Sequence, residues 1–365
     1  MYSNNEKVLI WMSMFDGMTN TKAHKLLSFY PNPIDIFKKL IADGSTIKKV
    51  VGEEVYFKML NIDNNEIKNY IQNLSDRGIK CVTILSEEYP EKLREIPDAP
   101  YILFCKGDVS LLFKRGIAIV GTRQPTAYAR GVTEEFAKAL AEKGLVIVSG
   151  LASGVDKISH ETALKVGGRT IAVLAGGFNV IYPAMNTNLA KEIEEKGLLV
   201  TEYRPDVSAT KFSFPNRNRI ISAISDATLI TEAGEKSGAL HTKNFAIEQG
   251  KLVFAIPGNI NNVKAVGSNK ILKDMQGAMV LEPNDILLQM HIPLVSVYEK
   301  KEVKISQQQG DVSETLILKA LQDGEQTLET LQEITKLETK TLNSCLTIMQ
   351  IRGLIKKLPG NSYSI

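Results

Sequence analysis

A doubly wound α/β fold is the fold class that the sequence predicts. Six short apolar runs alternate with helical segments and end in glycine-rich or polar turns. The runs span 117–120, 146–149, 170–174, 198–201, 227–231 and 252–256. Nearly continuous apolar strands that alternate with helices indicate a parallel sheet covered on both faces. In such a Rossmann-like sheet, ligands are expected beyond the carboxyl ends of the strands.

The pattern along the whole chain predicts a small all-helical N-terminal domain, the Rossmann-like domain, a linker and a C-terminal winged helix. These regions span 1–80, 81–290, 291–312 and 313–365. In the first region Val8, Trp11 and Phe15 recur at helical spacing, and we expect Asn20 or Thr21 to cap a second helix.

Further helices are expected near 47–60 and 64–76, and no strand-like run precedes Val82. The stretch 15–27 loosely resembles a degenerate helix-hairpin-helix, a small DNA-backbone binder, but only Gly17 of its Gly-x-Gly is present. A SAM-like helical packing module is an equally good interpretation.

In the last region, leucines at helical spacing mark three helices, and Pro359-Gly360-Asn361 marks a hairpin turn. This order is typical of a winged helix-turn-helix. From 311 onward six basic and seven acidic side chains give a net charge of −1. Readers of duplex DNA usually present a basic face, so docking to a protein is the favoured role.

The composition is that of an ordinary globular protein. The chain has 365 residues, 44% of them hydrophobic, and a net charge of only +3, so any basic surface is local. Cys81, Cys105 and Cys345 are widely spaced and form no Cys-x-x-Cys pair, which argues against disulfides and zinc. No run is long enough for a membrane span, and we expect a cytoplasmic protein.

The turn after the first run of the sheet contains Gly121, Thr122 and Arg123. Glycine lets the backbone approach an anion, and the threonine hydroxyl and the guanidinium both donate hydrogen bonds to phosphate. The helix that follows adds its positive N-terminal end. A tight turn with a solvated arginine explains the same residues equally well.

Two further strand ends carry loops of small residues, at 149–154 and 175–177. The first of them includes Gly150 and Ser153. Together the three loops predict a backbone-lined trough suited to phosphates or a sugar-phosphate chain. The chain has no Gly-x-Gly-x-x-Gly after its first strand, no P-loop and no Gly-x-Ser-x-Gly, so dinucleotide, ATPase and hydrolase sites of those kinds are excluded.

Basic and aromatic residues alternate in the segment 211–219, which holds Lys211, Phe214, Arg217, Asn218 and Arg219 among others. Single-stranded nucleic acid binds such mixtures, because cations neutralise its backbone and rings stack on its bases. Alternatively, Phe212 or Phe214 fills the core and one arginine forms an internal ion pair; we expect one residue of each kind.

The fifth strand leads through Glu232 to Ser237 and Gly238, which offer a further phosphate contact at a helix start. Glu232 is either a general base or, at least as well, a carboxylate that orients the Ser237 loop. Asp156 and His160, four apart, are a local helix pair rather than two ligands of a metal site.

With these motifs the chain resembles the DNA-processing protein A family (DprA, also called Smf). The resemblance covers the whole Rossmann-like domain in order, and the two flanking domains fit the family's fuller architecture. It rests on 116–123, 149–156 with His160, 182–186, 214–221, 237–238 and 254–258. Six ordered motifs are far more specific than any one of them.

The resemblance implies a homodimeric single-stranded DNA-binding protein that protects the strand and loads a RecA-type recombinase in DNA uptake, natural transformation or recombination. It implies no catalysis, no cofactor and no metal. It also implies that Arg123 and the Gly121-Thr122 backbone hold phosphate, while Lys211, Phe214, Arg217 and the Ser237-Gly238 loop line the path of the strand.

Three positions depart from the family's pattern. Ala184 and Ser153 stand where many members carry a basic residue, and His241-Thr242-Lys243 replaces the usual apolar residue, threonine and alanine. Lys243 is a candidate to compensate for a lost charge.

Two alternatives from other classes stay open. One is a nucleotide-processing hydrolase of the LOG, or lysine-decarboxylase-like, type, although its Pro-Gly-Gly-x-Gly-Thr-x-x-Glu motif is not matched at 232–238. The other is an adaptor that senses a small nucleotide.

Overall fold

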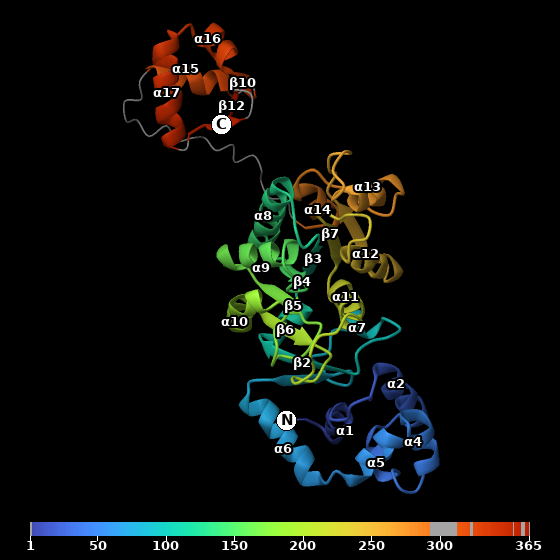
Figure 1. Ribbon diagram of the computed structural model, residues 1–365. Helices are drawn as coiled ribbons and strands as arrows, with labels where there is room; N and C mark the ends of the chain where they lie inside the picture. Colours follow the sequence, from blue (N-terminus) through green and yellow to red (C-terminus); the bar gives the residue numbers. More distant parts are fainter. Residues whose placement is uncertain (1, 293–311, 322–323, 353, 359–361, 365) are drawn as a thin grey trace. The chain divides into compact units, whose positions relative to one another are not determined.

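The computed structural model describes residues 2–292, 312–321, 324–352, 354–358 and 362–364. The chain forms two compact units, Met1–Val295 and Ser296–Ile365, each of which is described by itself (Figure 1). No helix among the described residues is long and apolar enough to cross a membrane.

Where the apolar spacing predicted four helical stretches, the first unit begins with six helices. They are α1 (Asn4–Ser13), α2 (Asn20–Phe29), α3 (Ile34–Lys38), α4 (Gly44–Val51), α5 (Glu53–Asn61) and α6 (Asn64–Asp76). Thr19 caps α2 by accepting a hydrogen bond from the Lys22 N–H at 3.3 Å, so the prediction of Asn20 or Thr21 was wrong. The stretch 47–60 divides at Gly52, whose φ of +90° ends α4.

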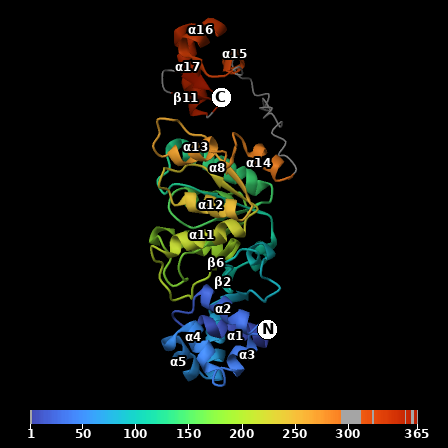
Figure 2. The ribbon, with the colours of Figure 1, turned by 90° about the vertical axis from the view of Figure 1, so that its right-hand side faces the viewer.

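The core of these helices continues onto the sheet. Trp11, Leu26 and Ile47 are fully buried, and they belong to one apolar cluster with Ile102 and Phe104 of strand β2 (Ile102–Gly107). Figure 2 shows α1 to α5 gathered beyond β2 at one end of the unit. Most members of this cluster come from the helices, and the cluster extends onto the sheet through Cys81, Ile102 and Phe104.

The described residues of this unit form a nine-stranded sheet in the order β1-β2-β6-β5-β4-β3-β7-β8-β9. The strands are β1 (Lys80–Thr83), β2 (Ile102–Gly107), β3 (Gly116–Val120), β4 (Val146–Ser149), β5 (Thr170–Val173), β6 (Leu198–Thr201), β7 (Ala227–Ile230), β8 (Leu252–Ala255) and β9 (Ala278–Met279). Strands β3 to β9 pair in parallel, whereas β1 and β2 join antiparallel beside β6. The doubly wound α/β prediction is confirmed.

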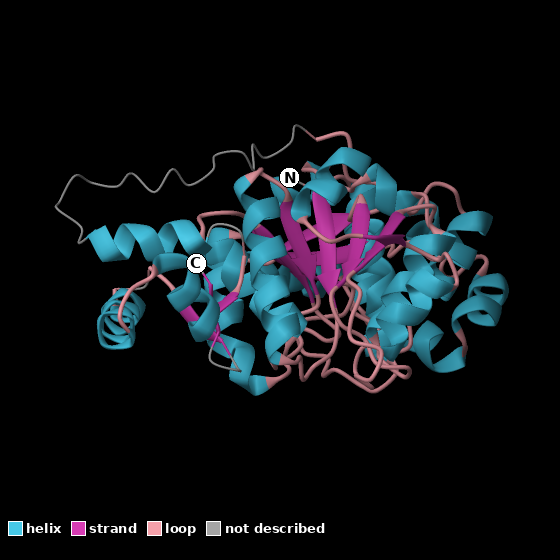
Figure 3. Ribbon diagram, turned by 90° about the horizontal axis from the view of Figure 1, so that it is seen from above, coloured by secondary structure: helices cyan, strands magenta, loops and turns pink. Residues whose placement is uncertain are grey.

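Helices cover both faces of the sheet (Figure 3). One face carries α8 (Ala127–Glu142), α9 (Val155–Lys165), α10 (Thr187–Lys196) and α14 (Pro283–Gln289). The other carries α7 (Glu91–Arg94), α11 (Ser213–Ala223), α12 (Ala239–Glu248) and α13 (Val266–Lys273). Alternate residues of each strand face opposite layers: Ile117 and Ile119 belong to the first core, Ala118 and Val120 to the second.

The second unit has a small core of its own, which includes Ile317, Leu331, Leu342 and Leu346. Its elements are α15 (Val312–Leu321), β10 (Gln326–Thr327), α16 (Leu328–Thr335), α17 (Thr339–Ile351), β11 (Lys356–Leu358) and β12 (Ser362–Ser364). The strands pair antiparallel in the order β10-β12-β11. Winged-helix identity stays a prediction, and the turn at 359–361 and the linker at 293–311 lie outside the described residues.

Candidate functional site

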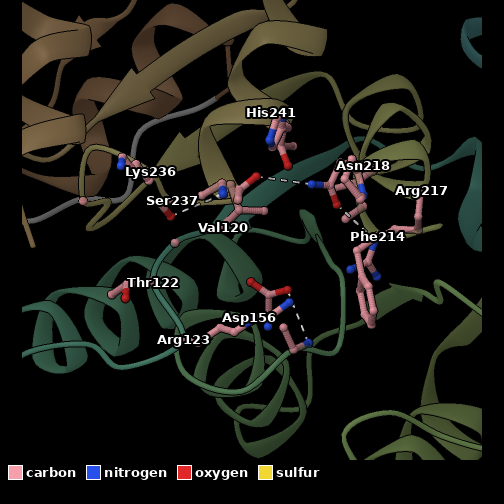
Figure 4. A pocket seen from close by; sticks show the side chains of 18 of the residues that line it. Val120, Thr122, Arg123, Asp156, Phe214, Arg217, Asn218, Lys236, Ser237 and His241 are labelled. Carbon is pink, nitrogen blue, oxygen red and sulfur yellow. Dashed lines mark hydrogen bonds between the residues drawn. The ribbon is translucent and has the colours of Figure 1, made fainter. Parts of the chain in front are cut away.

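A cleft opens where the strand order of the sheet reverses. Strand β3 lies between β4 and β7. From β3 the strand order runs outward through β4, β5 and β6 on one side and through β7, β8 and β9 on the other. Ligands of doubly wound sheets bind at such a switch point. The cleft has a volume of about 890 Å³. The β3–α8, β4–α9 and β7–α12 loops line it together with the start of α11 and Lys264 (Figure 4).

The β3–α8 loop is held tightly by its backbone. The Thr122 N–H donates to the Glu232 carbonyl at 2.8 Å, and the Val155 N–H donates to the Thr122 carbonyl at 3.2 Å. A side chain at Gly121 would place its Cβ only 2.6 Å from Val155 Cγ2. Gly121 is therefore explained by packing of β3 against α9, while the loop fixes Arg123 at the cleft.

Arg123 is exposed, and its guanidinium lies 5.6 Å from the ring centre of Phe214. No carboxylate among the described residues lies within ion-pair distance of it in this structure. A cation that rests on an aromatic face without an acidic partner keeps its charge available for an anion.

Glu232 connects two loops of the protein by hydrogen bonds of its carboxylate. Its buried carboxylate accepts hydrogen bonds from the Thr126 N–H at 2.9 Å, the Thr126 hydroxyl at 2.8 Å and Asn262 Nδ2 at 3.1 Å. It thereby fixes the N-cap of α8 and the loop before α13. Of the two hypotheses for Glu232, an orienting role fits the structure, although the loops that it orients are not the Ser237 loop.

Asp156 and His160 order the β4–α9 loop. The Asp156 carboxylate accepts from the Gly150 N–H at 3.1 Å and the Ala152 N–H at 3.4 Å. The Leu151 N–H, at a residue with φ of 57°, donates to His160 Nε2 at 3.3 Å. No group of three or more potential metal ligands occurs in the part of the chain that the structure describes.

The tautomer of His160 follows from its second partner. The Thr170 hydroxyl donates its proton to the Ile147 carbonyl at 2.6 Å, so it accepts from His160 Nδ1–H, which lies 2.6 Å away. His160 is therefore neutral, and burial lowers its pKa to about 3.

This buried histidine makes stability depend on pH. A folded-state pKa below the unfolded value of 6.5 stabilises the fold above pH 6.5, and that contribution is lost as pH falls toward 3. Between pH 7 and pH 5 we expect a loss of about 2 kcal/mol from His160 alone. Urea unfolding of wild type and His160→Gln at both pH values measures it: the variant should show a correspondingly smaller difference, and equal differences would contradict the assignment.

Arg217 is buried, although it reaches the cleft wall. Its guanidinium donates to the Gly150 carbonyl at 2.6 Å, to the Val173 carbonyl, and to Asn218 Oδ1 at 3.1 Å. Burial lowers the pKa of Arg217 to about 10, and the Asp156 carboxylate opposes that shift. Arg217 therefore joins the ends of β4 and β5 to α11, and its positive charge is compensated within the protein.

Arg219 lies on the other side of α11 and does not line the cleft. It pairs with Glu202 at 2.8 Å and Asp98 at 2.6 Å, and its side chain is 5% exposed. Both arginines of the segment 211–219 thus have internal partners, whereas one of each kind was expected. The structure does not bring Arg219 to the site predicted for it.

The aromatic residues of this segment face outward. Phe212 is 70% exposed beneath the Lys211 ammonium, which lies 5.0 Å from its ring centre. Phe214 is half-buried in the cleft wall, edge-on to Tyr182 with ring centres 5.3 Å apart. Neither phenylalanine fills the core, so that alternative was wrong and two ring surfaces remain open beside the cleft.

The N-terminus of α12 points its first turn toward the cleft. Ser237 Oγ accepts from the Ala239 N–H at 3.4 Å, and Asn218 Nδ2 donates to the Gly238 carbonyl at 3.3 Å. Lys236 and His241 line the same side and are exposed (Figure 4). A ten-residue helix contributes a positive end to this wall.

Lys243 lies away from the cleft. It is buried, and its ammonium donates to Gln276 Oε1 at 2.7 Å; burial lowers its pKa. Lys264, which sequence analysis missed, lines the cleft, and its ammonium donates to the Gln124 carbonyl at 2.8 Å. No local signal marks Lys264, because it follows β8 and reaches the β3–α8 loop only through folding.

The third loop of the predicted trough is covered. A Cβ at Gly176 or Gly177 would overlap the backbone of the segment 204–209, which packs over this loop. Nine of the thirteen predicted site residues line the cleft, namely Gly121, Thr122, Arg123, Lys211, Phe214, Arg217, Asn218, Ser237 and Gly238. Gly150, Ser153, Arg219 and Lys243 do not.

Comparison with known families places this cleft in context. Residues 80–291 match the family model of DNA recombination-mediator protein A. The chain belongs to that family. DNA processing protein DprA of Bacillus subtilis is 44% identical over 225 residues, which is 60% of this chain and 75% of that protein. DprA of Streptococcus pneumoniae is 37% identical over 274 residues, or 74% of this chain and 93% of that protein.

Solved structures of family members have the same fold. The crystal structure of DprA from Streptococcus pneumoniae superposes with a TM-score of 0.68 at 33% identity, covering 79% of this chain and 98% of that one. DNA processing protein A from Helicobacter pylori superposes with a TM-score of 0.54 at 34% identity, covering 58% and 95%. The latter was described for its single-stranded DNA binding mode.

Proposed function

We propose that this chain binds single-stranded DNA in the cleft and delivers the strand to a RecA-type recombinase, in recombination or during DNA uptake. The carrying observation is the unpaired Arg123 guanidinium on the Phe214 ring, opposite the N-terminus of α12. Backbone phosphates would contact Arg123, Lys236 and Lys264, which line the cleft. An unpaired base would stack on Phe214, whose ring a duplex could not use because its own bases are already stacked.

A binding role without catalysis is supported by the state of the acidic groups. Asp156 is the one carboxylate among the described residues that line the cleft, and two backbone N–H groups hold it. A hydrolase of the LOG type would need a free acid beside its substrate. The described part of the cleft offers a phosphate and base surface instead.

The proposal includes a cytoplasmic homodimer. Cys81, Cys105 and Cys345 are buried, and none of these described cysteines forms a disulfide, which suits a reducing compartment. Strand β9 is the outer strand of the sheet, and Met275 and Leu281, just before and after it, are 92% and 72% exposed. Such an apolar sheet edge is suited to contact with a second copy.

Arg123→Ala tests the proposed function. We expect affinity for a labelled single-stranded oligonucleotide to fall about tenfold or more, and the slope of log K against log salt to drop by about one, because one phosphate contact is lost. Fluorescence anisotropy across a salt series, with single strand and duplex of the same sequence, measures both quantities.

Arg130→Ala is the matched control, since Arg130 is exposed on α8 and does not line the cleft. It should bind like wild type. Equal binding of single strand and duplex, indifferent to Arg123, would overturn the proposal and favour a nucleotide sensor, which a thermal shift with AMP would detect.

A further inference from the structure

The connection between β5 and α10 presents an exposed apolar surface next to the cleft. Its inner part, at Gly176 and Gly177, is covered by the segment 204–209. Its outer part exposes Val180 by 57%, Tyr182 by 55% and Met185 by 70%. Tyr182 also lines the cleft and contacts Phe214 edge-on, so this surface continues the aromatic wall outward.

The connection is firmly anchored despite this exposure. The buried Asn186 donates through Nδ2 to the Leu151 carbonyl at 2.8 Å and the Ala152 carbonyl at 3.3 Å. At its other end the Asn179 N–H donates to the Pro205 carbonyl at 2.9 Å. Tyr182 and Met185 are therefore held outward by a fixed backbone, and folding alone does not bury them.

Charge indicates what this surface binds. Residues 178–186 contain no lysine, arginine, aspartate or glutamate, whereas other loops supply the cleft with Lys236, Lys264 and Arg123, whose guanidinium rests on the Phe214 ring. Cationic side chains stabilise bound phosphates, whereas aromatic ring faces and polarisable sulfur atoms stabilise bound nucleobases. A DNA strand whose phosphates contact these cations therefore turns its bases toward the apolar surface of the β5–α10 connection.

We propose that Tyr182 and Met185 form a stacking ledge for unpaired nucleobases, one that extends the Phe214 surface beyond the phosphate-binding cleft. The proposal rests on the proposed function, because it takes the backbone path from that function. It adds a base-binding subsite to which no phosphate contact contributes. The ledge sets how the strand leaves the cleft, with its bases against the β5–α10 connection.

Oligothymidylate and an abasic oligonucleotide of equal length separate base contacts from phosphate contacts. Tyr182→Ala should weaken binding of oligothymidylate about tenfold, the range measured for one lost aromatic stack. The same variant should bind the abasic strand within about twofold of wild type, because no phosphate contact is removed. Arg123→Ala should weaken binding of both strands.

Three further variants distinguish the loss of a base contact from a change in local structure. Tyr182→Phe should retain wild-type affinity, and Met185→Ala should lose about threefold on oligothymidylate alone, since sulfur contacts are weaker than a ring stack. Tyr128→Ala is the matched control, because Tyr128 is 54% exposed on α8 and does not line the cleft. Photocrosslinking of 5-iododeoxyuridine in the strand, read by mass spectrometry, should label Tyr182.

The outcomes separate the two proposals. Equal losses on base-bearing and abasic strands, or crosslinks at Phe214 without any at Tyr182, would overturn the ledge and leave the cleft proposal standing. If wild type binds neither strand, or if Arg123→Ala changes nothing, the cleft proposal fails and the ledge falls with it.

Discussion

Glu202→Ala should destabilise the first unit by about 3–5 kcal/mol, because it leaves the buried Arg219 guanidinium without its buried partner. The side chains of Glu202 and Arg219 are 6% and 5% exposed and pair at 2.8 Å. Asn20 Nδ2 of α2 donates to the same carboxylate, so the loss also loosens the N-terminal helices from the sheet. The midpoint of urea unfolding measures the effect.

Two comparisons isolate the buried pair. Asp98, whose side chain is 60% exposed, is the outer partner of Arg219. Asp98→Ala should therefore lower the free energy of unfolding by at most about 1 kcal/mol. Replacing both members, as Glu202→Leu with Arg219→Leu, should recover much of the loss, because an apolar pair carries no desolvation penalty. If Glu202→Ala proves no worse than Asp98→Ala, the network contributes little net stability.

The sheet was predictable because the signals for its strands are local. The run expected at 117–120 is β3 (Gly116–Val120), and the run at 227–231 is β7 (Ala227–Ile230). Each buried parallel strand is apolar throughout and is followed by a turn, so neighbours in sequence suffice to find it. The two-residue β9 and the antiparallel pairing of β2 with β6 depend on distant partners, which no local pattern records.

The candidate site was predictable where a loop follows a strand, and less so where side-chain direction decides. Arg217 and Arg219 are two residues apart, and both were candidates for DNA binding, with one of them expected in an internal ion pair. One bonds the Gly150 carbonyl, 67 residues away in sequence, and the other bonds Glu202. Both partners are brought close only by the packing of α11 on the sheet, and burial then removes the arginines from solvent.

Lys243 and Lys264 also show that position in the sequence does not determine which lysines reach the cleft. Lys243 follows Ser237-Gly238 closely in sequence, yet helical geometry turns it toward Gln276. Lys264 belongs to none of the motifs, yet it reaches the cleft through the loop before α13. The cations of such a site come from separate loops, so their number is predictable only after the loops are placed.

Two glycines of the predicted site should respond in different ways to alanine. Gly150→Ala places a methyl group where the Arg217 guanidinium lies. Displacing that buried group should destabilise the fold by about 2–3 kcal/mol. It should also weaken single-strand binding at least tenfold, because Arg217 holds the start of α11, and with it Phe214, against the ends of β4 and β5.

Gly238→Ala should weaken binding without destabilising the fold. No atom lies within 4 Å of the added Cβ, and the backbone there is helical, with φ of −60° and ψ of −22°. Stability should therefore stay the same or rise by about 0.5 kcal/mol. Single-strand affinity should still fall about fivefold, because the methyl group stands where we propose that a phosphate approaches the α12 N-terminus.

Urea unfolding and anisotropy on the same two variants decide between a structural and a ligand-binding role for each glycine. A loss of affinity in Gly238→Ala without a loss of stability can arise only at a surface that the strand touches. If Gly238→Ala binds like wild type, the phosphate path runs along Arg123 and Lys264 without the α12 N-terminus. If Gly150→Ala keeps its stability, Arg217 has moved into the cleft, where its charge would raise affinity and steepen the salt dependence.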